Sequence, residues 1–153
     1  VLYPTDFSPL ADKALAYAVS LCAVFEATLV LAHVVELPAM LPELLPDTGD
    51  MAYNGLDEAA LERLADLKDK AAEQGVVAEQ VVADGLAYRE IARIVDEAEI
   101  DLVVIPTHGR SGLSHMLFGS VAEKVVRLAK CPVLTVRTGE RVPAVGKQEA
   151  MAH

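Results

Sequence analysis

A glycine-rich run late in the chain carries the residues best suited to binding a ligand. The run begins with Thr107-His108-Gly109-Arg110 and ends with Gly119-Ser120 at the head of a helical pattern. Glycine lets the backbone approach an anion closely, and a helix N-terminus offers unpaired N–H groups and a positive dipole. The Ser120 hydroxyl and the Arg110 guanidinium are further candidate contacts to a phosphate. Arg110 is equally consistent with simple solvation, and Ser120 with a helix cap, because Ser120 and Glu123 have capping-box spacing.

Short β-rich runs alternate with amphipathic helical runs along the chain. The predicted strands are 1–5, 28–35, 76–83, 101–105 and 132–137. The first predicted helix begins at Ser8-Pro9 with Ser8 as its N-cap, and the later helices cover 57–74, 88–98 and 120–129. This alternation predicts an α/β fold: a single doubly wound parallel sheet of five strands, with right-handed crossovers and helices on both faces.

Apolar residues at helical spacing indicate which helix faces should be buried. The first helix carries such a face as far as Phe25, and the helix over 57–74 carries one that includes Leu61, Leu64 and Leu67. We therefore expect these side chains to point inward, against the sheet.

The chain is predicted to form one domain over residues 1–137, followed by a loose tail over 138–153. An irregular excursion interrupts the domain at 36–56, where three prolines exclude a long regular element. This excursion either covers a ligand site or a partner subunit, or folds back on its own domain.

Composition limits the classes of function. The formal net charge of −10 argues against a nucleic-acid binder, which needs a basic surface. No apolar run is long enough to span a membrane, and no basic-then-apolar leader precedes the first strand. Cys22 and Cys131 lie far apart in apolar contexts, which favours two reduced cysteines in a cytoplasmic protein over a metal or redox site.

In a doubly wound sheet, ligands bind beyond the carboxyl ends of the strands. The candidate residues are then Pro4 and Asp6 after the first strand, Val34 at the end of the second and Thr107 after the fourth. Asp6 also has a purely structural interpretation, because its place before Ser8-Pro9 suits a helix cap.

Several motifs, in order, resemble the universal stress protein family. They are Leu2-Tyr3-Pro4-Thr5-Asp6-Phe7-Ser8, Leu31-Ala32-His33-Val34, Ile105-Pro106-Thr107-His108-Gly109-Arg110-Ser111-Gly112, the nine-residue spacing from Gly109 to Gly119-Ser120, and Cys131-Pro132-Val133-Leu134. The similarity runs from residue 1 to about residue 137. It implies an adenine nucleotide alpha hydrolase-like fold with strand order 3-2-1-4-5, in which the first and fourth strands are neighbours at the point where the winding reverses.

The resemblance also implies the ligand, ATP, ADP or AMP, and the part that each site residue takes. Asp6 would hydrogen-bond the ribose or the base edge, the backbone of Val34 would contact the adenine, and Pro4 would wall its pocket. The loop of Thr107, His108 and Arg110 would surround the phosphates, which the amides of Gly109, Gly119, Ser120 and Val121 would hold. Any Mg²⁺ would be carried by the phosphates themselves.

One position departs from the family's nucleotide-binding motif. Its first glycine is Pro106 in this sequence, and proline fixes φ and has no N–H. The loss of one hydrogen bond to a ligand would cost about 1 kcal/mol, which weakens binding several-fold. If the ligand-bound loop required a positive φ at this position, the loss of affinity would be larger.

Three interpretations of function remain. By the resemblance, the chain is a dimeric stress-response regulator or sensor that binds an adenine nucleotide, paired antiparallel through strand 132–137, with at most slow ATP hydrolysis or autophosphorylation. The alternative, favoured by Pro106, is a dimeric interaction module that acts without nucleotide. A phospho-receiver would use Asp84 and Thr107, but it needs an acidic pair after the first strand and a lysine after the fifth, and this chain has neither.

His108 and His115 lack a nearby carboxylate or thiol, so no metal site is expected.

Overall fold

Five parallel strands form one sheet in the order β3-β2-β1-β4-β5. The computed structural model describes residues 1–9, 11–36, 49–107 and 119–137, with the backbone alone over 49–55. The strands are β1 (Leu2–Pro4), β2 (Leu29–Val35), β3 (Ala78–Asp84), β4 (Val103–Pro106) and β5 (Val133–Val136). The predicted fold class and strand order are therefore confirmed.

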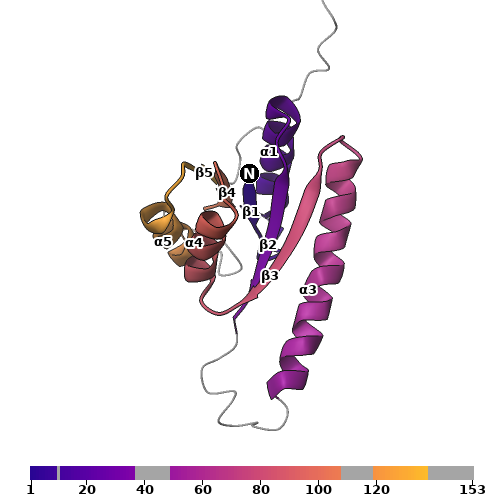
Figure 1. Cartoon of the computed structure of the whole chain (residues 1–153), viewed down its shortest axis with the longest axis vertical. Coiled ribbons are helices and arrows are strands. Elements are labelled where there is room, and N and C mark those ends of the chain that lie inside the picture. Colours follow the sequence, from indigo (N-terminus) through magenta and orange to yellow (C-terminus); the bar gives the residue numbers. More distant parts are fainter. Residues whose placement is uncertain (10, 37–48, 108–118, 138–153) are drawn as a thin grey trace, which may run out of the picture.

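Helices cover both faces of the sheet. Figure 1 shows α1 (Ala11–Phe25) and α3 (Gly49–Ala72) on one side, and α4 (Ala87–Glu97) and α5 (Ser120–Leu128) on the other. Successive strand residues point to opposite faces. Tyr3 accordingly belongs to the core beneath α1 and α3, and its neighbour Leu2 to the core beneath α4 and α5.

The winding of the chain reverses between β1 and β4. The helix after β1 packs on one face of the sheet, whereas α5, which follows β4, packs on the other. β1 and β2 share three Cα pairs, but β1 and β4 share only one, Leu2 with Val103. A crevice at the carboxyl ends of these two strands is the expected ligand position in such a sheet.

The first helix begins later than predicted. α1 starts at Ala11, whose N–H donates to the Ser8 carbonyl at 2.9 Å, so Ser8-Pro9 forms a turn ahead of the helix. The Ser8 hydroxyl is buried with no hydrogen-bond partner in the described part of the chain, and it is not a cap. At the other end of α1, Phe25 is 71% exposed, which contradicts its predicted burial.

Helix α3 begins earlier than predicted, at Gly49 instead of residue 57. No proline lies between Pro46 and residue 57, and a glycine such as Gly55 inside a helix costs only about 1 kcal/mol relative to alanine. The predicted excursion therefore includes the first turns of this helix, while 37–48 and the predicted tail 138–153 lie outside the described residues. The remaining predicted elements match the structure within two residues at each end.

The buried face of α3 is narrower than predicted. Ala60, Leu64, Leu67 and Ala71 are buried, but Leu61 is 43% exposed. With about 100° of rotation per residue, the four buried positions span an arc of about 60°, and Leu61 lies about 60° outside it. The prediction that Leu61 points inward is wrong.

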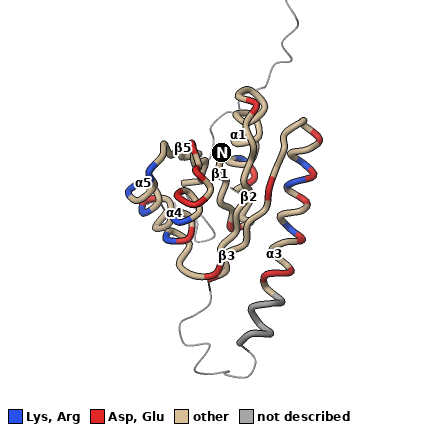
Figure 2. Tube along the Cα trace, in the orientation of Figure 1, with Lys and Arg blue, Asp and Glu red and all other residues tan. Residues whose placement is uncertain are grey.

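The outer surface is charged and mixed. Figure 2 shows acidic and basic residues interspersed along α3, α4 and α5. The Lys130 ammonium lies 2.8 Å from the Asp96 carboxylate and joins the end of α5 to α4, although an exposed pair of this kind contributes little stability. Among the described residues, no helix is both long and apolar enough to cross a membrane.

Candidate functional site

A pocket of about 580 Å³ lies at the carboxyl ends of β1, β2 and β4. Its size falls within the range usual for small-molecule sites. Every predicted site residue that the structure describes lines it: Pro4, Asp6, Val34, Thr107, Gly119, Ser120 and Val121. The other three, His108, Gly109 and Arg110, lie outside the described residues. The residues that sequence reasoning selected from four separate segments thus meet around one cavity.

The N-terminus of α5 supplies backbone donors to this pocket. The first intrahelical bond runs from the Glu123 N–H to the Gly119 carbonyl at 3.0 Å. The N–H groups of Ser120, Val121 and Ala122 therefore have no acceptor within the helix. The Gly119 N–H differs, because it donates to the Thr107 carbonyl at 2.5 Å. Ser120 and Val121, more than Gly119, offer amides to an anion here.

The predicted capping box at this helix is wrong. The N-cap is Gly119, in an extended conformation with φ −70° and ψ 152°, and no side chain caps it. Ser120 is the first residue of the helix, and Glu123 pairs with Arg127 at 3.0 Å, one turn further on. Ser120 therefore lines the pocket, and its hydroxyl is not the helix cap of the alternative interpretation.

Pro106 fits its strand without strain. The N–H groups of Val103 and Thr107 both donate toward β5, to the carbonyls of Pro132 and Val136. Alternate residues of a strand direct their N–H groups to opposite neighbours, so the nitrogen of Pro106 faces β1. There the strands no longer pair, and the sheet needs no donor. Pro106 is extended as the last residue of β4, so the proline removes one possible ligand contact and leaves the fold intact.

Asp6 sits in a tight turn that two side chains close. The Phe7 N–H donates to the Thr5 hydroxyl at 2.9 Å, and the Ser8 N–H donates to one Asp6 carboxylate oxygen at 2.9 Å. The Asp6 carboxylate therefore closes a turn ahead of α1 and does not cap the helix, so the predicted cap is wrong. Asp6 also lines the pocket. Phe7 has φ +59°, a left-handed conformation that is uncommon for a residue with a β-carbon.

Comparison with known proteins identifies the family of this chain. The sequence model of the Universal stress protein family matches residues 1–137. The chain belongs to the universal stress protein family. Universal stress protein YxiE of Bacillus subtilis is 36% identical over 146 residues, covering 90% of this chain and 97% of YxiE.

Two solved structures show the same fold. That of MJ0577, a universal stress protein of Methanocaldococcus jannaschii, has a TM-score of 0.78 at 26% identity and covers 92% of this chain and 96% of its own. A universal stress protein in complex with cAMP has a TM-score of 0.66 at 25% identity, with 88% and 94% covered. The resemblance found in the sequence is confirmed over residues 1–137.

In this universal stress protein, the described residues place the N-termini of α4 and α5 at the pocket, and a carboxylate lies at that of α4. Glu36 accepts a hydrogen bond from the Ala87 N–H, at the start of α4, at 2.6 Å. Nearby, slight desolvation of the exposed Asp84 carboxyl raises its pKa, and the negative charges of Asp57 and Glu90 raise it further. The α4 end of the pocket is therefore acidic and disfavours phosphate. The N-terminus of α5, in contrast, has no side-chain cap and suits a phosphate better.

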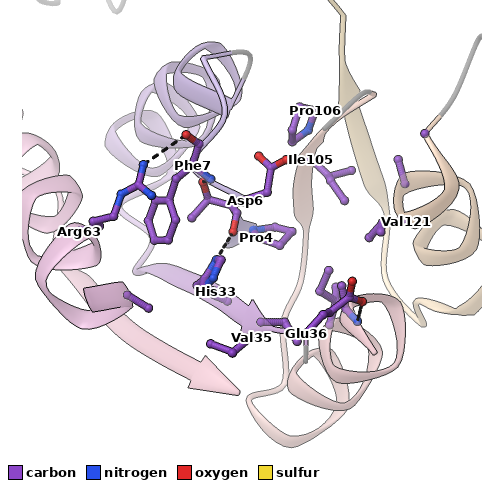
Figure 3. Close-up of a pocket in the computed structure, with 18 of the residues that line it drawn as sticks. Pro4, Asp6, Phe7, His33, Val35, Glu36, Arg63, Ile105, Pro106 and Val121 are labelled. Atoms are coloured by element: carbon purple, nitrogen blue, oxygen red, sulfur yellow. Dashed lines mark hydrogen bonds between the residues drawn. The ribbon is translucent and has the colours of Figure 1, made fainter. Parts of the chain in front are cut away.

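Three side chains that were not among the predicted site residues also line the pocket of this family member: Phe7, His33 and Arg63. Figure 3 shows them beside Asp6, contributed by the β1–α1 turn, β2 and α3. No pattern in the sequence places Arg63 near Asp6, because the contact depends on how α3 packs across the sheet. The phospho-receiver hypothesis fails in this topology: β2 separates β3 from β1, and Asp84 is exposed at the end of an edge strand.

Neither cysteine has the character of a reactive group. Cys22 is buried, Cys131 is half-buried, and both are free thiols. Burial raises the pKa of each thiol, which disfavours the reactive thiolate. Among the described residues, no three His, Cys, Asp or Glu side chains are grouped to hold a metal ion.

Proposed function

We propose that this universal stress protein binds an adenine nucleotide in the pocket at the β1–β4 crevice, as a stress-response regulator or sensor. The observation that carries the proposal is the convergence of Asp6, Val34, Ser120 and Val121 on one cavity. The uncapped N-terminus of α5 is the natural place for the phosphates. A relative with the same fold in complex with cAMP supports an adenine nucleotide as the ligand class.

The residues present fit such a ligand. Apolar side chains, among them Pro4, Ile91 and Ile105, give the base a surface to pack on. The backbone of Val34 stands ready for the base edge and the Asp6 carboxylate for a ribose hydroxyl, while the amides of Ser120 and Val121 would hold phosphate oxygens. ATP, ADP and AMP all fit this arrangement of contacts and differ only in the number of phosphates at α5. Any Mg²⁺ would be bound by these phosphates and would enter with the ligand.

We infer binding without efficient turnover. Among the described residues, two carboxylates line the pocket, and each accepts a backbone N–H: Asp6 from Ser8 and Glu36 from Ala87. These contacts give both carboxylates structural duties. Slow ATP hydrolysis or autophosphorylation is the most that we propose. The two free thiols fit a reducing compartment, and we infer a cytoplasmic location.

The ligand content of the purified protein tests the proposal. The protein is denatured, and the supernatant is compared with adenine-nucleotide standards on an ion-exchange column. We expect a bound adenine nucleotide or, if the preparation is empty, saturable binding of added ATP by calorimetry. An empty protein that also fails to bind ATP, ADP and AMP would refute the proposal and favour an interaction module that acts without nucleotide.

We further infer a homodimer that pairs through β5. This strand lies at the edge of the sheet, and Leu134 on it is 37% exposed. An apolar edge strand is normally covered, and pairing with a second copy would satisfy its open backbone groups. We expect light scattering to give twice the mass of one chain. A single-chain mass at micromolar concentration would contradict this inference.

A further inference from the structure

The turn that carries Asp6 needs external support. Phe7, the next residue, holds φ +59° although it has a β-carbon, and such a conformation persists only where the surroundings enforce it. Two local hydrogen bonds, to the Thr5 hydroxyl and the Asp6 carboxylate, close the turn. Both come from side chains within the turn itself, so they do not fix its position relative to the pocket.

Two other elements hold this turn from outside. The His33 ring on β2 lies 4.5 Å from the Phe7 ring, and its Nδ1 lies 2.7 Å from the Thr5 carbonyl. A carbonyl oxygen only accepts, so Nδ1 carries the proton of this bond. The Arg63 guanidinium on α3 lies 4.0 Å from the Phe7 ring centre, and it donates a long hydrogen bond of 3.4 Å to the Phe7 carbonyl. Figure 3 shows these contacts at one side of the pocket.

We propose that Arg63 is a positioning residue for the nucleotide, which acts by holding Phe7 and, through the turn, the Asp6 carboxylate. The inference rests on the proposed function and deepens it. Arginine suits this task because a planar guanidinium stacks on an aromatic ring while it donates hydrogen bonds in its own plane. The contact ties α3 to the turn that carries Asp6, and both Arg63 and Asp6 line the pocket.

A direct charge contact between Arg63 and the phosphates is the competing explanation, and the geometry disfavours it. Figure 3 places Arg63 and Val121 on opposite sides of the pocket, with Pro4 and Asp6 between them. Val121 belongs to the first turn of α5, where the phosphates are proposed to lie. Arg63 therefore stands beside Asp6 and away from the phosphate end.

Three variants separate the two explanations. Arg63→Met removes the charge and the planar group, Arg63→Lys keeps the charge but loses the planar stack, and Lys70→Met removes one charge from an exposed position on the same helix. For each, the ATP dissociation constant is measured by calorimetry. The exchange rates of the Phe7 and Ser8 amide protons are measured by NMR in the nucleotide-free protein. Urea unfolding confirms that each variant is folded.

We expect both Arg63 variants to weaken ATP binding by roughly three- to tenfold, as the loss of an exposed cation–π contact and a weak hydrogen bond would. Exchange at Phe7 and Ser8 should quicken in both variants and stay unchanged in Lys70→Met. In an Asp6→Ala background, Arg63→Met should add less than about a twofold loss, because the turn then has no carboxylate to position.

Arg63→Lys with wild-type affinity beside a weakened Arg63→Met would show a charge contact and overturn the proposal. Unchanged exchange at Phe7 and Ser8 in Arg63→Met would also overturn it. A wild-type protein that binds no adenine nucleotide would instead refute the proposed function. The exchange rates would then still decide, by themselves, whether Arg63 holds the turn.

Discussion

Ser120→Asp is expected to lower ATP affinity at least about 100-fold without unfolding the protein. Ser120 is the first residue of α5 and lines the pocket. A carboxylate there would accept hydrogen bonds from the N–H groups that would otherwise bind the phosphates. Its negative charge would also repel the phosphates. At about 4 Å and an effective dielectric constant of about 20, two unit charges interact by about 4 kcal/mol. The same carboxylate interacts favourably with the helix dipole, which should raise the free energy of unfolding by about 0.3–1 kcal/mol.

The opposite signs of these two effects make the variant informative. Calorimetry with ATP measures the loss of binding, and urea unfolding measures the gain in stability. Ser120→Ala is the matched control: it loses one hydroxyl and introduces no charge, so affinity should fall only several-fold. Ser120→Asp with wild-type ATP affinity would show that the phosphates do not lie at α5, even if the pocket binds nucleotide.

Much of the fold could be predicted because each element carries its own signal. The run Leu29–Val35 is almost wholly apolar, which is typical of a strand that is covered on both faces, and it lies in the sheet interior. Once a doubly wound sheet is inferred, geometry alone brings the residues after its strands together. Pro4, Asp6 and Thr107 line one pocket for this reason.

The sequence did not indicate features that depend on how distant elements pack. Arg63 contacts Phe7 across 56 residues, and Glu36 caps α4 across 51 residues. Neither residue stands out in its own segment, since charged side chains on exposed positions are common. The predicted N-cap of α5 differs from the observed one by a single residue, because Gly119 and Ser120 both suit that position and backbone geometry alone decides between them.

Leu64→Ala is expected to lower the free energy of unfolding by about 3 kcal/mol, because it removes a fully buried side chain between α3 and the sheet. Urea unfolding, followed by circular dichroism, measures the change. Leu61→Ala is the matched control, with the same chemistry one turn earlier on the same helix. At 43% exposure it should cost less than about 1 kcal/mol.

The difference between these two variants tests the orientation of α3, on which the place of Arg63 depends. Leu64 follows Arg63 directly, so a helix rotated to bury Leu61 would carry the guanidinium away from Phe7. Comparable losses in the two variants would contradict the narrow buried face of α3. They would also remove the geometric basis for the contact between Arg63 and the Asp6 turn. A large loss in Leu64→Ala alone supports the helix orientation that brings Arg63 to the pocket.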